Sequence, residues 1–290
     1  MKSLSAECFC IAIRARKEGR PLFPLNPEDR FDFHRVKVPR GKWGADPFLF
    51  EKDGQAYLFA ELFNLFTGKG ALYVRSIGNE HAKWKRCNIE KCHLSFPNVF
   101  MQGGETLMMP ETSELRQVNV YQATKFPERW MKCETRLANV NAVDSVVLFE
   151  SGSIASYVRN SRQDASLTAF DSNGTQLWSL QDKDKKLRPA GNPFFDGGLA
   201  YFIGQNCQSS YGEGLCVYLL DQTKGIQGMA IREIGSEGLD YLTPRSHSIG
   251  IHTYNKSEHY EVIDIKFRKF SLLRILGKPF RVLFRTRRTR

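Results

Sequence analysis

The sequence predicts an all-β fold, a five-bladed β-propeller with four-stranded blades. The main observation is a repeat in which a short apolar strand, a Gly-centred hairpin and a second apolar strand follow one another. Four copies start at Asp46, Phe96, Asp144 and Asn192, at intervals of 50, 48 and 48 residues, and a weaker fifth copy starts near His247. No helical apolar periodicity of useful length interrupts these copies. Strand repeats of this length are typical of propeller blades.

Each repeat has room for a four-stranded sheet. In the first repeat, segments 46–50 and 57–61 flank a turn at Asp53-Gly54, and segments 70–75 and 84–89 supply the outer strands. A sheet with two apolar faces cannot bury both by itself, so we expect five such sheets to stack in a ring over residues 30–265. A sandwich of two sheets is the alternative, but such a fold would not require the copies of the repeat to start at nearly constant intervals.

The composition is that of an ordinary globular chain. With 290 residues, of which 41% are hydrophobic and 25% charged, the chain is long enough for one large core. We assign residues 1–265 to the propeller and residues 266–290 to a basic amphipathic tail, which we expect to be helical. Seven cysteines, an odd number, favour reduced thiols over a disulfide framework. The spacing Cys87-x4-Cys92-His93 lacks a second ligand pair, so neither a metal nor a cofactor is predicted.

The net charge of +11 is concentrated in the tail. Residues 266–290 contain ten basic residues and no acidic residue, which leaves 32 basic and 31 acidic residues in the rest of the chain. Phe, Leu, Ile and Val are interleaved with these charges, a composition typical of segments that lie on an anionic bilayer. A solvated tail, or a helix packed on the propeller, is the alternative. Nucleic-acid binding is not expected, because the rest of the chain has neither a basic stripe nor a known motif for it.

The first residues of the chain do not have the pattern of a signal peptide. Glu7 interrupts an apolar run that is too short for a signal-peptide core, and no other segment approaches the roughly 18 uninterrupted apolar residues of a membrane span. Together with the basic tail, this predicts a cytoplasmic protein that is attached peripherally to the inner face of the membrane.

Candidate functional residues lie where the innermost strands of the blades converge on the axis. These are four carboxyl groups and two groups that are basic or titratable: Asp46, Asp144, Glu61, Glu111, Arg188 and His252. Several carboxyl groups in one pocket are what glycosidic chemistry requires, because one group acts as base or nucleophile while another is kept protonated as acid. The alternative is that these residues only start turns or end strands.

Several strings in the range 40–265 carry a resemblance to a known family. They are Ala45-Asp46-Pro47-Phe48-Leu49-Phe50 with Glu61, His93-Leu94-Ser95-Phe96-Pro97-Asn98-Val99-Phe100, Met109-Pro110-Glu111-Thr112-Ser113, Tyr121-Gln122-Ala123 with Phe126-Pro127-Glu128-Arg129-Trp130, Val143-Asp144, Leu187-Arg188-Pro189-Ala190-Gly191, and Gly204-Gln205-Asn206-Cys207 with Tyr211-Gly212. In this order they resemble the propeller domain at the N-terminus of plant glucosamine inositolphosphorylceramide transferases. That domain is similar in turn to the five-bladed propellers of family 43 and family 32 glycoside hydrolases.

The resemblance implies roles for two carboxyl groups and leaves a third role open. It places a base or nucleophile on Asp46 and a second carboxylate on Asp144. Where family 32 has its acid Glu on the fourth blade, this chain has Ala190-Gly191-Asn192-Pro193, without a carboxylate. We expect Glu111 to replace that acid, with Glu61 in reserve.

Three functions are compatible with these residues. The first is a glycosyltransferase that acts on a carbohydrate or sugar nucleotide in the assembly of a cell-surface polysaccharide or glycolipid. The second is a glycoside hydrolase that uses the same acids with water. The third is a non-catalytic glycan-binding module, with sugars beside the rings of Phe96, Trp130 and Tyr211. We predict catalytic roles for Asp46, Glu111 and Asp144, and substrate binding by Glu61, Phe96, Arg188, Gln205, Tyr211 and His252.

Overall fold

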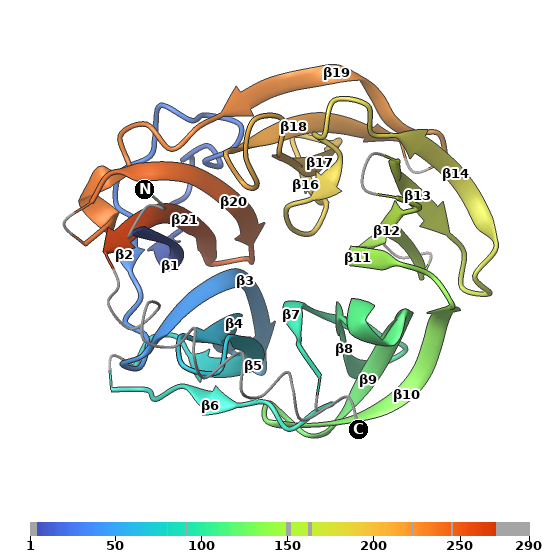
Figure 1. Ribbon diagram of the computed structural model, residues 1–290, viewed down its shortest axis with the longest axis horizontal. Coiled ribbons are helices and arrows are strands. Elements are labelled where there is room, and N and C mark those ends of the chain that lie inside the picture. The colour runs from blue at the N-terminus through green and yellow to red at the C-terminus, as the bar shows by residue number, and fades with distance from the viewer. Residues whose placement is uncertain are drawn as a thin grey trace.

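A computed structural model describes residues 5–270, except 80, 91, 149–151, 162–163, 222 and 245. Five antiparallel sheets stand around a common axis, so the predicted five-bladed propeller is confirmed (Figure 1). Within the described residues, the helical elements are two 3-10 turns, Ser113–Leu115 and Asp240–Leu242. No helix in this part of the chain has the length and apolarity of a membrane span.

In each of the first three blades the strands follow one another in chain order, and the first strand is the innermost (Figure 1). Blade one contains β3 (Lys42–Lys52), β4 (Gln55–Asn64), β5 (Lys69–Ser76) and β6 (Lys85–Arg86). Blade two contains β7 (Ser95–Gln102), β8 (Glu105–Glu111), β9 (Gln117–Lys125) and β10 (Arg129–Ala138). Blade three contains β11 (Ala142–Leu148), β12 (Ser153–Arg159), β13 (Ala165–Phe170) and β14 (Gln176–Gln181).

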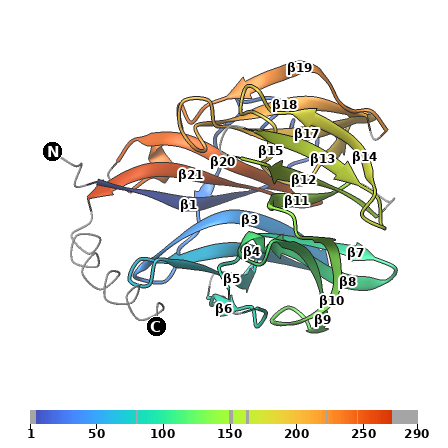
Figure 2. The same ribbon diagram turned by 45° about the vertical axis from the view of Figure 1, so that its right-hand side comes forward.

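The last two blades depart from this simple order. Blade four contains β15 (Arg188–Pro189), β16 (Phe194–Asp196), β17 (Leu199–Asn206), β18 (Gly214–Asp221) and β19 (Gly225–Ile234), and both β15 and β16 pair with β17. Blade five contains β20 (Ser248–Lys256), β21 (Tyr260–Phe270), β1 (Ser5–Ala15) and β2 (His34–Arg35). The ring is therefore closed by the N-terminal segment, which supplies the two outer strands of the last blade (Figures 1 and 2).

A buried ion pair joins the N-terminal strand to blade five. Strand β1 pairs with β21 along its whole length, from Ser5 opposite Phe270 to Ala15 opposite Tyr260. Arg14 is 1% exposed, and its Nε lies 2.7 Å from Oε2 of buried Glu261. Both charges lose their hydration on folding, so each buried charge needs the opposite charge of the other residue in place of water. The pair therefore stabilises the register that closes the ring.

The predicted boundary between the propeller and the tail at 265/266 needs a correction. Strand β21 continues to Phe270, and Lys266 is buried within it, with Nζ 3.1 Å from Oε2 of Glu7. Lys266 belongs to the propeller and not to the basic tail, because its charge is paired inside blade five. The remaining tail, 271–290, lies outside the described residues, and so does its predicted helix.

Apolar side chains from neighbouring blades form the core. Phe48 of blade one and Phe96 of blade two meet edge to face, with ring centroids 4.7 Å apart. Phe59 packs in the same way against Trp130 of blade two, at 6.1 Å. Each sheet thus buries its faces against the next sheet, as the repeat predicts.

Candidate active site

The inner strands place one residue of each blade next to the axis by means of a local irregularity. Strands β3, β7 and β11 each contain a register shift, and the residue there has a positive φ: 48° at Asp46, 49° at Phe96 and 47° at Asp144. Strand β20 has a similar shift around His252. A β-bulge of this kind inserts an extra residue and redirects its side chain. Such backbone strain costs on the order of 1–3 kcal/mol and is common at functional sites.

Gly191 of blade four, directly before the fourth copy of the repeat at Asn192, has a backbone environment that leaves no room for a side chain. Its φ is 153°, and a Cβ atom at this position would lie 1.9 Å from the carbonyl oxygen of Tyr254. No side chain fits there without moving the backbone of blade five. The polar groups of blade four reach the axis from Arg188 on β15 and from Tyr211 in the loop after β17 instead.

A chain of hydrogen bonds links Asp46 to blades two, four and five. The backbone N–H of Phe96 donates to Oδ2 of Asp46 at 3.2 Å, and the N–H of Asp46 donates to Oδ2 of Asp264 at 2.9 Å. His252 Nδ1 lies 2.7 Å from the same Asp264 oxygen, and its Nε2 lies 2.6 Å from the hydroxyl of Tyr211 and 3.6 Å from Oδ1 of Asp46. The carboxyl group of Asp46 is therefore held in one orientation at the axis.

A second group of contacts is centred on Arg188. Its Nε donates to Oδ2 of Asp144 at 2.5 Å, and its Nη2 lies 3.8 Å from Oε2 of Glu111. The amide of Gln205 donates to the same Asp144 oxygen at 3.1 Å. The guanidinium also lies over the ring of Tyr211, 5.0 Å from its centroid. Arg188 thus connects carboxyl groups of blades two and three with the aromatic ring of blade four.

The environment shifts the proton affinities of these groups. Burial, reinforced by the charges of Asp144 and Asp264, raises the pKa of Asp46 to about 7, although His252 opposes the shift. Burial and the charge of Asp144 also raise the pKa of Glu111 to about 7. Two carboxyl groups with pKa values near neutrality can take up or release protons at physiological pH.

Glu61 and His252 are shifted toward their protonated forms. Burial and the neighbouring carboxylates, above all Asp46 and Glu111, raise the pKa of Glu61 well above its ordinary value. Within the described residues, its buried Oε1 has no hydrogen-bond partner. For His252, burial lowers the pKa, but the carboxylate of Asp264 outweighs burial and raises it. The site therefore contains an acid whose protonated form is favoured, beside a histidine whose protonated form is favoured as well.

Asp46, His252 and Asp264 are also the group at the axis that could hold a cation, because their ligand atoms lie within 4.8 Å of one another. However, both ring nitrogens of His252 are engaged, one with Asp264 and the other with Tyr211. A metal ion would have to displace at least one of these hydrogen bonds. The arrangement therefore fits a proton-holding network better than a preformed metal site.

Eight of the nine predicted site residues contribute side chains to the axial cluster. The exception is Phe96, whose ring is fully buried against Phe48, so that only its backbone N–H serves the site. The prediction that this ring contacts a substrate is wrong, because the ring packs between blades. Gln205 is also fully buried, and its Nε2 donates to Asp144 and to the carbonyl of Pro189, so it positions Asp144. Trp130, expected beside a sugar in the binding-module reading, is a core residue.

Sequence reasoning missed Asp264, a central member of the cluster. It is fully buried on β21, where its Oδ1 also accepts the N–H of Thr253 at 2.8 Å. A carboxylate between Ile263 and Ile265 in a buried strand is the pattern that could have identified it, because an unpaired charge is rarely tolerated there.

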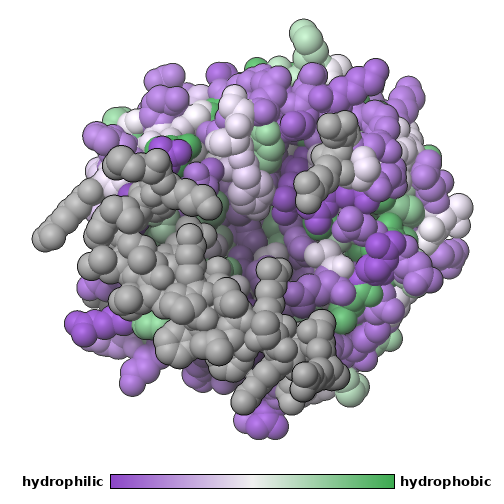
Figure 3. All heavy atoms as spheres, in the orientation of Figure 1, coloured by the Kyte–Doolittle hydropathy of each residue, from purple (hydrophilic) through white to green (hydrophobic). Residues whose placement is uncertain are grey.

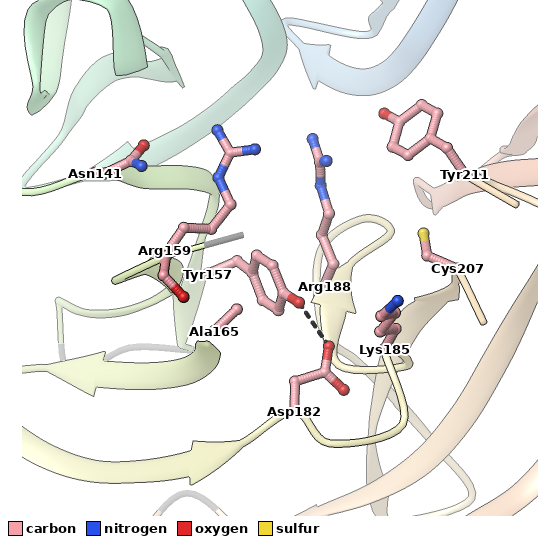
Figure 4. A pocket seen from close by; sticks show the side chains of 10 residues that line it. Asn141, Tyr157, Arg159, Ala165, Asp182, Lys185, Arg188, Cys207 and Tyr211 are labelled. Carbon is pink, nitrogen blue, oxygen red and sulfur yellow. Dashed lines mark hydrogen bonds between the residues drawn. The ribbon is translucent and has the colours of Figure 1, made fainter. Parts of the chain in front are cut away.

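A cavity of about 550 Å³ opens beside the axial cluster, between blades three and four (Figure 4). Ten residues line it: Asn141, Tyr157, Arg159, Ser161, Ala165, Asp182, Lys185, Arg188, Cys207 and Tyr211. In the space-filling view, the uncovered part of one end of the ring is hollowed near its centre, and hydrophilic residues surround the hollow (Figure 3). Arg188 and Tyr211 belong to both the cavity and the axial cluster, so the two adjoin each other.

Two comparisons with curated proteins give related results. The chain is 30% identical over 193 residues to glucosamine inositolphosphorylceramide transferase 1 of Arabidopsis thaliana, a match that covers 60% of this chain and 25% of the relative. The protein of the same name from Oryza sativa subsp. japonica is 30% identical over 195 residues, covering 61% of this chain and 26% of the relative. The matched region thus spans about a quarter of these relatives.

Solved structures show the same fold. A GH62 alpha-L-arabinofuranosidase catalytic domain of Coprinopsis cinerea is similar with a TM-score of 0.57 at 11% identity, and covers 80% of this chain and 93% of its own. The alpha-L-arabinofuranosidase of Podospora anserina, solved in complex with cellotriose, gives 0.56 at 10% identity with the same coverage. The family model for the N-terminal region of glucosamine inositolphosphorylceramide transferase 1 matches residues 36–234, more than half of the chain, and the protein therefore belongs to this family.

Proposed function

We propose that the protein is a carbohydrate-active enzyme, and that it transfers a glycosyl group in the assembly of a cell-surface polysaccharide or glycolipid. The observation that carries the proposal is the meeting of Asp46, Glu61, Glu111 and Asp144, from three blades, at one axis, with pKa values raised to about 7 in Asp46 and Glu111. Transfer is favoured over hydrolysis because the curated relatives are named as transferases.

Asp46 is the proposed base. A carboxyl group with a pKa of about 7 is ionised in a large fraction of molecules at neutral pH and is still basic enough to accept a proton from an acceptor hydroxyl. Its orientation is fixed by the N–H of Phe96 and by His252. Asp144 and Asp264 raise its proton affinity through their charges, and Glu61, whose pKa burial raises well above its ordinary value, is the proposed proton donor to a leaving oxygen, with Glu111 as the second candidate.

The second candidate function is hydrolysis of a glycosidic bond by the same acids. In that case Asp46 would act on water or on the sugar itself, and Glu61 or Glu111 would protonate the leaving group. The presence in one site of Asp46, with a pKa of about 7, and of Glu61, whose pKa is raised well above its ordinary value, favours this possibility. A motif for binding a sugar-nucleotide donor would argue against hydrolysis, and the sequence contains no such motif.

Assays with two classes of substrate distinguish these functions. The purified full chain would be incubated with sugar nucleotides plus a glycolipid acceptor, and separately with aryl glycosides. We expect product from the first set, and loss of at least 100-fold in rate in Asp46→Asn with unchanged sugar binding. Asp184→Asn, which removes an exposed carboxylate, is the matched control. Sugar binding without turnover in either assay would instead identify a non-catalytic glycan-binding module.

We propose further that the protein is cytoplasmic and is attached to the inner face of the membrane. The support is the composition of residues 271–290, which contain seven basic residues, no acid and several large apolar residues. Each basic residue near an anionic surface contributes about 1 kcal/mol. Co-sedimentation with phosphatidylserine vesicles should therefore be strong for the full chain and lost in a chain that ends at residue 270. Equal sedimentation of both chains would refute the attachment.

A further inference from the structure

We infer that the cavity between blades three and four is a subsite for an anionic group, a phosphate or a carboxylate, carried by the sugar substrate. The inference deepens the proposed function, on which it rests for the identity of the ligand as a sugar. It is based on the charges and hydrogen-bond donors that line the cavity, of which Arg159 and Lys185 have no part in the axial cluster.

The lining of the cavity is strongly biased toward positive charge. It contains three cations, Arg159, Lys185 and Arg188, and a single carboxylate, Asp182. Within the described residues Asp182 forms no ion pair with these cations; its Oδ2 accepts the hydroxyl of Tyr157 at 2.7 Å and its Oδ1 accepts the backbone N–H of Lys186 at 2.8 Å. The Asp182 carboxylate offsets one positive charge, and the lining retains an excess of two cations.

Two of the three cations are available to a ligand. Within the described part of the chain, neither Arg159 nor Lys185 forms a side-chain hydrogen bond or an ion pair, and both side chains are exposed. Arg188, by contrast, is held by Asp144. Figure 4 shows the guanidinium groups of Arg159 and Arg188 extending in the same direction into the open space. Free cations on opposite blades are suited to an anion with several acceptor oxygens.

The fold places this subsite next to the acids. Arg159 ends β12, Lys185 lies in the turn before β15, and Tyr211 lies in the loop after β17. Arg188 forms the border, because its Nε contacts Asp144 on the axial side while the residue also lines the cavity. An anionic group held by Arg159 and Lys185 would therefore direct the attached sugar ring past Tyr211 toward the axial carboxyl groups.

Titration calorimetry with simple probes tests the inference. At low salt, we expect glucose 1-phosphate and glucuronic acid to bind at least tenfold more tightly than methyl glucoside, and glucose 1-phosphate more tightly than inorganic phosphate. The double variant Arg159→Ala with Lys185→Ala should lose at least tenfold in affinity for the anionic sugars and keep its affinity for methyl glucoside. Lys183→Ala removes an exposed charge from the same turn outside the cavity lining and should behave as the wild type.

Equal binding of charged and neutral sugars, or unchanged affinity in the double variant, would overturn the inference. Circular dichroism of each variant excludes loss of folding as the cause. Asp46→Asn separates this inference from the proposed function, because it removes the proposed base and leaves the cavity lining intact. Tight binding of anionic sugars by a wild type that turns over no glycoside would retain the subsite and reject the catalytic function.

Discussion

Removal of the Asp46 charge is expected to stabilise the protein while it abolishes activity. Burial raises the pKa of this carboxyl from 3.8 to about 7, so the folded protein holds the proton more tightly than the unfolded chain does. The stability that this group contributes is fully present below pH 3.8 and is lost as the pH rises toward 7. A shift of about three pKa units corresponds to about 4 kcal/mol at 1.36 kcal/mol per unit.

Asn at position 46 resembles the protonated acid at every pH. The free energy of unfolding of Asp46→Asn should therefore exceed that of the wild type by up to about 4 kcal/mol at pH 8, and by only about 1 kcal/mol at pH 4.5. Urea denaturation at both pH values measures the difference. Asp184→Asn, an exposed substitution of the same chemistry, should change stability little at either pH. Two results would refute the conclusion that burial disfavours the ionised form of Asp46. One is a variant less stable than the wild type at pH 8, and the other is a difference in free energy of unfolding that is the same at both pH values.

Three further predictions concern ring closure, the fourth blade and the pH profile. Arg14→Met leaves the carboxylate of Glu261 buried without its partner, and should lower the free energy of unfolding by about 3–5 kcal/mol; a loss below about 1 kcal/mol in urea denaturation would contradict this. Gly191→Ala drives a Cβ atom against the carbonyl of Tyr254 and should cost at least about 2 kcal/mol in the same measurement. If Asp46 is the base, kcat/KM should fall tenfold per unit as the pH drops below about 7, and a flat profile from pH 5 to 8 would exclude that role.

The architecture of the blades could be predicted because it is encoded locally. Each copy of the repeat contains its own turn residues and alternating apolar residues, so hairpins such as the one at Asp53-Gly54 can be identified without knowledge of the rest of the chain. Strand β1 could not be assigned to a blade from the sequence, because it pairs with β21, more than two hundred residues away, and no hairpin turn next to it indicates this partner. Closure of a ring depends on such distant contacts, which a single sequence does not reveal.

The part of the site that depends on equivalent positions in the repeat could be predicted from the sequence. Asp46 and Asp144 occupy equivalent places in two repeats, and this placement brings both to the axis. Phe96 has the same position and nearly the same φ, yet its ring turns into the core, since side-chain direction depends on neighbours as well as on backbone conformation. The lack of a carboxylate in Ala190-Gly191-Asn192-Pro193 is visible in the sequence, but the close approach of Gly191 to the backbone of blade five is not.

Three features that each reduce stability occur together at the axis. Asp46 and Asp144 adopt positive φ values, buried Glu61 and half-buried Glu111 have raised pKa values, and an oxygen of Glu61 has no hydrogen-bond partner within the described residues. A protein selected for stability alone would replace such residues with apolar ones, as it does between the blades. Their concentration in one place, on several independent segments, is the arrangement expected where strain and desolvation serve binding or catalysis. Strand β21 belongs both to the closure of the ring and to the site, because it carries Glu261, which pairs with Arg14 of β1, and Asp264, which binds His252.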